Sequence, residues 1–147
     1  MLLAGLFMAG CSCYEEPCAE YTIPHVRLTG FDSVELSNVI VRRWDTAGFY
    51  TRLIDSSVQH LSRKGATGIA SLGSLYPWLG CNFEIVFPAI PRTVRLYNFR
   101  YTMQSQEVCP GWNKKELSCE NLLSTYMQEG TLRNYEDDAQ GYIVIAK

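Results

Sequence analysis

The 147-residue chain has little histidine and no concentration of positive charge. It contains two histidines and 13 Lys and Arg against 15 Asp and Glu, for a net charge of −2, and it has no basic cluster larger than short pairs such as Arg42-Arg43 and Lys114-Lys115. Proteins that bind nucleic acid normally carry a basic patch that neutralises phosphates. The charge distribution therefore argues against a nucleic-acid partner.

Motifs that carry catalysis or hold cofactors are also missing. The sequence has no glycine-rich loop of the P-loop or dinucleotide-binding type. The segment Gly68-Ile-Ala-Ser71-Leu-Gly73 has the wrong spacing for a nucleophile elbow, and His25 and His60 lack a partner that would make a nucleophilic pair. The cysteines do not form two adjacent pairs with zinc-knuckle spacing. We predict no catalytic residues, no cofactor and no metal, so the protein is not expected to be an enzyme.

Long apolar runs are absent, since crossing a bilayer as a helix takes about 20 apolar residues. The one apolar run at the start of the chain, Leu2 to Met8, is much shorter and is followed by the small residues Ala9 and Gly10 and then by Cys11. An apolar core followed by small residues is typical of a secretory signal peptide.

The residues Met8-Ala9-Gly10-Cys11 resemble the lipobox of bacterial lipoproteins, in which an aliphatic residue, a small residue and Gly or Ala precede the cysteine. The resemblance implies cleavage before Cys11, a diacylglycerol on its sulfur and acylation of the new amino terminus. More than one acyl chain is needed for stable membrane anchoring, and this modification supplies several. The alternative is a buried N-terminal strand or helix that contains an ordinary cysteine.

The residues after Cys11 bear on location. Ser12 is not the Asp that marks retention in the inner membrane, and Glu15-Glu16 resembles the acidic pattern that accompanies export to the cell surface in some lipoproteins. The resemblance thus implies an outer-membrane lipoprotein, on the periplasmic face or at the surface. We expect a signal peptide at 1–10, a lipidated tether at 11–21 and a single domain at 22–147.

The body of the chain has the texture of a β protein. A hydrophobic content of 47% and a charged content of 19% are typical of a globular domain. The residues 39–44 and 49–54, rich in β-branched and aromatic types, flank a loop that ends in Gly48 and predict a hairpin. Alternation over 81–87 places Cys81, Phe83, Ile85 and Phe87 on one face, and residues 141–146 predict a final strand.

Alternation over 92–101 predicts a further strand, with Val94 and Leu96 on one face and three aromatic residues, Tyr97, Phe99 and Tyr101, on the other. Residues 122–127 fit a helical face as well as a strand. Seven or eight short strands without a long helix predict an all-β fold, an antiparallel β-sandwich of immunoglobulin-like or transthyretin-like shape.

Six cysteines leave an odd number once Cys11 carries lipid. Disulfides are expected in an exported protein, so two disulfides and one remaining thiol are predicted, with the connectivity open. We favour Cys109 with Cys119, because the segment between them is rich in turn-forming residues. Cys18 with Cys81 or Cys13 is the second choice.

Aromatic residues in predicted loops are the candidate ligand contacts. Tyr76, Trp78 and Trp112 lie in such loops, where exposed aromatic rings stack on sugars or hold protein partners. Their alternative role is to plug one end of the sandwich. The sequence as a whole predicts a lipid-anchored envelope protein with a non-catalytic binding or structural role and an envelope protein or glycan as partner. The alternatives are a carbohydrate- or peptide-binding module and a hydrolase.

Overall fold

The computed structural model describes residues 13–62, 69–75, 80–109, 119–135 and 141–147. Twelve strands and one 3₁₀ turn are found in these ranges. They are β1 (Tyr14–Pro17), β2 (Glu20–Tyr21), β3 (His25–Thr29), β4 (Val39–Asp45), η1 (Thr46–Gly48), β5 (Leu53–Gln59), β6 (Ile69–Ser74), β7 (Cys81–Phe87), β8 (Arg92–Thr102), β9 (Ser105–Val108), β10 (Glu120–Gln128), β11 (Thr131–Asn134) and β12 (Ile143–Ala146).

The strands form three sheets. The largest has the order β11-β10-β8-β7-β4-β5, and β2 joins it by pairing in parallel with β10. A three-stranded sheet has the order β12-β3-β6, in which β12 and β3 are parallel and β3 and β6 antiparallel. The third sheet is the antiparallel pair β1-β9.

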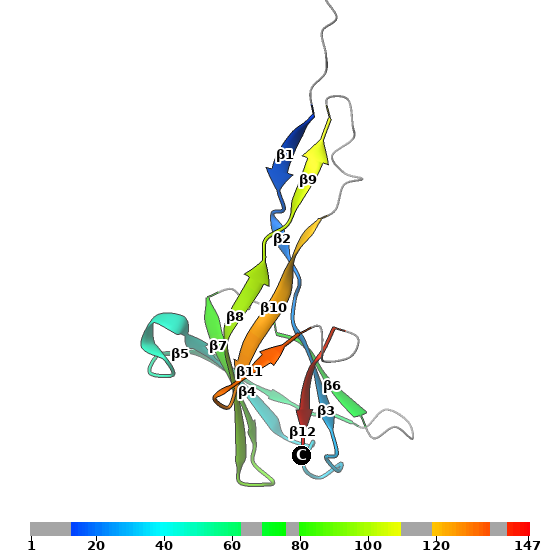
Figure 1. Cartoon of the computed structure of the whole chain (residues 1–147). Helices are drawn as coiled ribbons and strands as arrows, with labels where there is room; N and C mark the ends of the chain where they lie inside the picture. Colours follow the sequence, from blue (N-terminus) through cyan, green and yellow to red (C-terminus); the bar gives the residue numbers. More distant parts are fainter. Residues whose placement is uncertain (1–12, 63–68, 76–79, 110–118, 136–140) are drawn as a thin grey trace, which may run out of the picture.

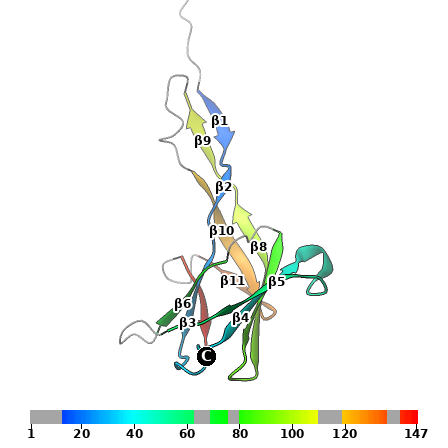
Figure 2. The ribbon, with the colours of Figure 1, turned by 180° about the vertical axis from the view of Figure 1, so that it is seen from behind.

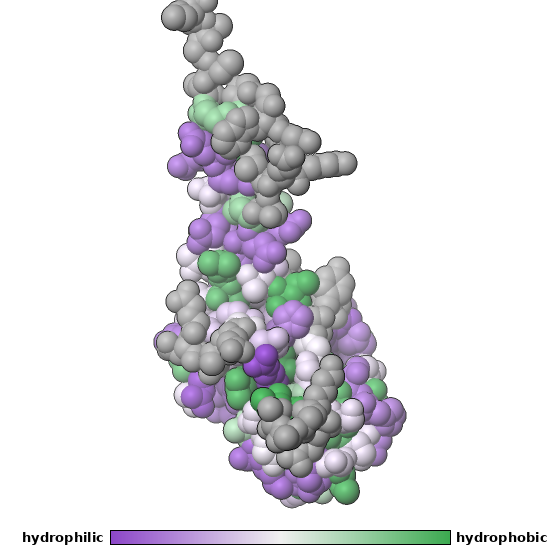
Figure 3. Space-filling model, turned by 90° about the vertical axis from the view of Figure 1, so that its right-hand side faces the viewer, coloured by the Kyte–Doolittle hydropathy of each residue, from purple (hydrophilic) through white to green (hydrophobic). Residues whose placement is uncertain are grey.

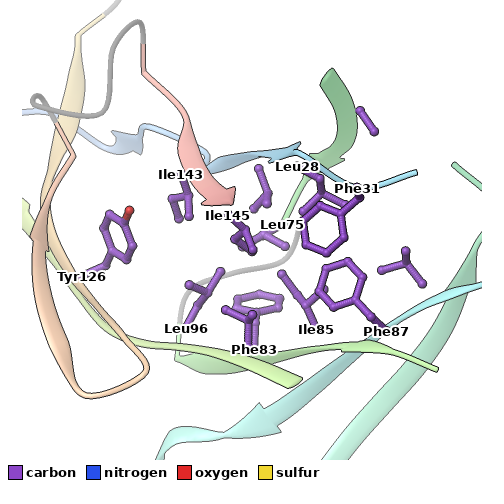
Figure 4. Packing of buried hydrophobic residues seen from close by; sticks show 14 of the residues in the cluster. Leu28, Phe31, Leu75, Phe83, Ile85, Phe87, Leu96, Tyr126, Ile143 and Ile145 are labelled. Atoms are coloured by element: carbon purple, nitrogen blue, oxygen red, sulfur yellow. The ribbon is translucent and has the colours of Figure 1, made fainter. Parts of the chain in front are cut away.

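The hydrophobic core lies between the seven-stranded and the three-stranded sheet (Figure 4). Leu28, Ile143 and Ile145 come from the smaller sheet, and Phe83 and Leu96 from the larger one; all five are almost completely buried. On β7 the alternation predicted from the sequence is confirmed, because Cys81, Phe83, Ile85 and Phe87 all belong to the core. This packing of two sheets confirms the predicted all-β, sandwich-like fold.

A narrow stalk extends from the sandwich (Figures 1 and 2). It consists of β1, β2, β9 and the adjoining ends of β8 and β10. β8 and β10 are long strands that run from the sandwich into the stalk. On the face shown in Figure 3, the described residues of the stalk are largely hydrophilic, with scattered hydrophobic ones. The residues 13–21, which were expected to form part of a tether, thus include two strands.

Two disulfides fasten the N-terminal segment to the stalk. Cys13 is bonded to Cys109, at the end of the β1-β9 pair, and Cys18 is bonded to Cys119, just before β10. The predicted bond between Cys109 and Cys119 is therefore wrong, and so is the second choice for Cys18. Each disulfide joins two cysteines that are about 100 residues apart in the sequence but lie side by side in the stalk. Cys81 belongs to neither disulfide and lies buried in the core.

The side chain of Asn121 joins three segments where the stalk meets the body. This completely buried residue donates from Nδ2 to the carbonyl oxygen of Cys18 (2.8 Å) and accepts at Oδ1 from the N–H of Gln104 (2.8 Å). Its own carbonyl accepts from the N–H of Thr22 (2.9 Å). One amide thus satisfies backbone groups that the ladder leaves unpaired at this junction.

The face assignment along β8 is partly wrong, because the strand contains a bulge. Asn98 has a φ of 55°, and the pairing of β8 with β10 shifts register between Thr125 and Met127. An extra residue in a strand turns the following side chains to the opposite face. Phe99 consequently packs on the core, with its ring 6.0 Å from that of Phe83, whereas Tyr97 stays on the outer face.

The strand count exceeds the seven or eight predicted, because β1, β2, β9 and β11 have no more than four residues each. Such short strands are defined by their partners and not by a sequence pattern. The described part of the chain contains no helix of the length and hydrophobicity that a bilayer crossing requires.

Candidate functional site

The outer face of the large sheet, opposite the core, carries two rows of polar and aromatic side chains. Pairing of β4 with β7 and of β7 with β8 aligns Arg42, Glu84 and Arg95 in one row. In the next row Trp44 is paired with Asn82. Side chains alternate between the two faces along a strand. Because Phe83 and Leu96 face the core, their neighbours in these two rows face outward.

Glu84 lies between two arginines. Arg42 Nη1 is 3.0 Å from Glu84 Oε2, and Arg95 Nε is 3.2 Å from Oε1. The carboxylate side chain is only 7% exposed, whereas the two arginine side chains are 38% and 55% exposed. Burial of a carboxylate is tolerated when it is paired and hydrogen-bonded, as it is here. The guanidinium groups therefore have fixed positions but stay accessible at the surface.

The connection between β4 and β5 folds over these rows. Asp45 caps η1 by accepting from the N–H of Ala47 (2.9 Å). The next two residues, Phe49 and Tyr50, have φ values of 39° and 66°. This left-handed conformation costs a non-glycine residue about 1–2 kcal/mol. Two consecutive aromatic residues thus hold a strained backbone.

Tyr50 fixes this connection to the sheet. Its hydroxyl lies 3.0 Å from the carbonyl oxygen of Phe83 and 3.2 Å from that of Leu96, and it donates its one hydrogen to either. The guanidinium of Arg95 lies 4.9 Å from the centre of the Tyr50 ring. Burial raises the pKa of the Tyr50 hydroxyl, which stays protonated and able to donate.

Phe49 projects from the fixed connection beside Tyr97. Their rings are 5.1 Å apart and nearly perpendicular, and Phe49 is 60% exposed. Both rings line two adjoining cavities of about 500 Å³ and 310 Å³. We call the two cavities together the outer-face groove. The larger one is lined by Arg42, Phe49, Glu84, Thr93, Arg95, Tyr97, Glu129 and Gly130, and the smaller one by Thr46, Phe49, Asn82, Tyr97 and Asn98.

Backbone strain is concentrated at this groove. Four non-glycine residues in the described ranges have a positive φ: Phe49, Tyr50, Asn98 and Glu129. Three of them line the groove, and the fourth, Tyr50, positions Phe49. Strained residues of this kind cluster at ligand-binding and active sites, where the surrounding structure holds them in place.

Two polar side chains in the second row are buried or nearly so. Asn82 is 3% exposed and lines the smaller cavity. The indole Nε1 of its neighbour Trp44 is buried and lacks a partner within the described ranges. Buried polar groups are nearly always hydrogen-bonded, so the indole N–H of Trp44 is an exception among the described residues.

Several residues predicted from the sequence lie outside the described ranges. These are Cys11, Tyr76, Trp78 and Trp112. Both histidines are exposed: the ring of His25 lies 6.1 Å from that of Tyr142, and Nδ1 of His60 lies 2.5 Å from the carbonyl oxygen of Ser37. A cluster of potential metal ligands comprises Cys13, Glu107 and Cys109, but its two cysteines are bonded to each other and cannot act as thiolate ligands.

The outer-face groove was not found by sequence reasoning. The alternation on β7 could have indicated it, because this pattern places Asn82 and Glu84 on the face of the sheet opposite the core. Alternation on the neighbouring strands places Arg42, Arg95 and Tyr97 on the same outer face. The positive φ values of Phe49 and Asn98 leave no such signal, because neither is a glycine.

No protein-family model matches the chain, and it matches neither a curated protein nor a solved structure.

Proposed function

We propose that the protein is a lipid-anchored component of the bacterial cell envelope with a non-catalytic binding or structural role. The observation that carries this proposal is the position of the disulfide between Cys13 and Cys109, at the end of the stalk farthest from the sandwich. Cys13 follows the proposed lipidation site, Cys11, by two residues. Lipid on Cys11 would therefore attach the membrane to the tip of the stalk, and the stalk would hold the sandwich away from it.

The two disulfides support an exported location. Disulfides persist in oxidising compartments such as the periplasm and the cell surface and are rare in the cytosol. Both close loops of about 100 residues, so they belong to the framework of the fold. This is the environment that the lipobox-like residues imply, and Ser12 favours the outer membrane, at its periplasmic face or at the cell surface.

The chemistry of the groove supports a binding role over a catalytic one. Glu84, its most buried carboxylate, is held by two arginines, one on each of its oxygens. A carboxylate with both oxygens engaged in this way is poorly placed to take a proton from a substrate. A hydrolase, the less favoured alternative, would need an acid and a base with matched pKa values.

Mass spectrometry of the protein purified from its native membrane tests the lipid anchor. We expect the mature chain to begin at Cys11 and to carry three acyl chains, or two where the amino terminus is not acylated. A Cys11→Ser variant should keep its apolar N-terminal segment and lose all acyl mass. An intact Met1 together with an unmodified Cys11 in the native protein would refute the proposal.

The second candidate function is a carbohydrate- or peptide-binding module, and the outer-face groove favours it. The contacts predicted for it from the sequence are the loop aromatics Tyr76, Trp78 and Trp112. Glycan and peptide arrays probed with the parent chain and a Trp78→Ala variant test these contacts. Equal signals from both chains would show that Trp78 takes no part in binding.

A further inference from the structure

We propose that the outer-face groove is a binding site for an uncharged saccharide, with one sugar ring packed against Phe49 and Tyr97. The proposal rests on the charge, the aromatic surface and the polar side chains of the groove. It does not depend on the lipid anchor, because none of the residues that line the groove belongs to the stalk.

The charge of the lining selects against ionic ligands. In the larger cavity two arginines are balanced by Glu84 and Glu129, and the smaller cavity is lined by uncharged residues. A site for phosphate, sulfate or a carboxylated ligand would hold an excess of positive charge. The buried carboxylate of the groove, Glu84, already uses both of its oxygens on Arg42 and Arg95. The groove therefore suits a neutral molecule.

The aromatic surface provides the apolar contact that a sugar ring needs. One face of a pyranose carries mainly C–H groups, and these pack on the face of an aromatic ring. Phe49 is exposed yet held in place by the fixed backbone of Tyr50 and by the ring of Tyr97. Since its position is set before binding, little side-chain entropy is lost when a ligand arrives.

Polar groups around the aromatic pair match pairs of hydroxyl groups. The amides of Asn82 and Asn98 each offer a donor and an acceptor, and both line the smaller cavity beside Tyr97. Arg42 and Arg95, on the larger side, present planar guanidinium donors that can bridge two neighbouring oxygens. A sugar hydroxyl beside Asn82 can both donate to and accept from its amide.

The size of the groove agrees with a short oligosaccharide. Sites for small molecules typically have volumes of about 300–1,000 Å³, and the larger cavity alone has about 500 Å³. The smaller cavity adjoins it, since Phe49 and Tyr97 line both. The two cavities would thus hold neighbouring sugar units, one of which packs against the aromatic pair.

Saturation-transfer difference NMR with the full chain tests this proposal. The probes are neutral oligosaccharides of glucose, galactose, mannose and N-acetylglucosamine at millimolar concentration, with sialylated and sulfated glycans and short peptides as separate arms. The variants are Phe49→Ala and Asn82→Ala, and the matched control is Leu132→Ala. Leu132 is as exposed as Phe49, at 60%, but lies on β11 and does not line the groove.

We expect binding of at least one neutral oligosaccharide, at least a tenfold loss of affinity in Phe49→Ala and Asn82→Ala, and unchanged affinity in Leu132→Ala. Circular dichroism would show that Phe49→Ala, a change at an exposed side chain, is folded. The proposal is overturned if no neutral oligosaccharide binds, if only charged glycans or peptides bind, or if a folded Phe49→Ala variant binds as well as the parent. If the native protein carries no lipid but binds the sugar, only the lipid anchor is refuted. If the native protein carries lipid but does not bind the sugar, only the saccharide site is refuted.

Discussion

The two disulfides are predicted to stabilise the fold by amounts that depend on each other. Each joins cysteines about 100 residues apart, with separations of 96 and 101. Because both span almost the same loop, the second bond closes only a small ring formed by residues 13–18 and 109–119. In the loop-entropy model a ring of about 15 residues contributes about 3 kcal/mol, and a loop of about 100 residues about 4.7 kcal/mol.

Removing either disulfide should therefore cost about 3 kcal/mol, and removing both about 8 kcal/mol, which exceeds the sum of the two single losses. The variants are Cys13→Ser with Cys109→Ser, Cys18→Ser with Cys119→Ser, and all four changes together. A common Cys11→Ser background excludes exchange with that thiol. Urea unfolding followed by circular dichroism measures the free energy of unfolding for each chain.

With a denaturant dependence of about 2 kcal/mol/M, a loss of 3 kcal/mol lowers the urea midpoint by about 1.5 M. The quadruple variant should be largely unfolded without urea, since typical domains have only 5–15 kcal/mol of stability. The reasoning fails if either double variant unfolds at the parent midpoint. It also fails if the quadruple variant loses no more than the two double variants added together.

Three further predictions concern single side chains. Asn121→Ala should lower the free energy of unfolding by about 2–3 kcal/mol, because it leaves buried backbone groups without partners; urea unfolding checks this, and Leu122→Ser, at a half-exposed position, should cost under 1 kcal/mol. Lys147, and then the N–H of Asp32, lower the pKa of Glu35. The ionised form thus favours folding, so its contribution is present above the usual Glu pKa of about 4.3 and is lost as pH falls through the lower folded value. Urea midpoints between pH 6 and 3 should fall less steeply in Glu35→Gln, and parallel curves would contradict this. Burial raises the pKa of the Cys81 thiol, which is 8% exposed; the native protein should react with a thiol reagent at pH 8 at least tenfold more slowly than the urea-unfolded protein, and equal rates would contradict the buried position.

Sequence patterns predicted the sandwich well, because a strand that buries one face has apolar residues at every second position. The residues of β7 are the clearest example, since Phe83, Ile85 and Phe87 all reach the core as predicted. The hairpin of β4 and β5 is confirmed too, although β5 begins at Leu53 and not at residue 49. The connection is longer than predicted because Phe49 and Tyr50 are in left-handed conformations that end the strand pattern.

The stalk and the groove depend on contacts between distant segments, which composition and periodicity do not encode. Cys13 and Cys109 are neighbours only because β1 pairs with β9, and both strands are too short to be recognised alone. Likewise, alternation could not reveal that Asn98 forms a bulge that separates Tyr97 from Phe99. Each failure arose where one local irregularity or one long-range pair overrides the local pattern.

The disulfides also decide how the protein responds to mechanical load. A pull on the chain ahead of Cys13 meets only four residue pairs between β1 and β9 and two between β2 and β10. Without the disulfides, the hydrogen bonds of such a short ladder would break one after another. The covalent bonds to Cys109 and Cys119 instead divide the tension between β9 and β10. Force therefore enters the sandwich through β8 and β10, the two long strands that are paired with each other. The stalk should lengthen little before the core itself unfolds.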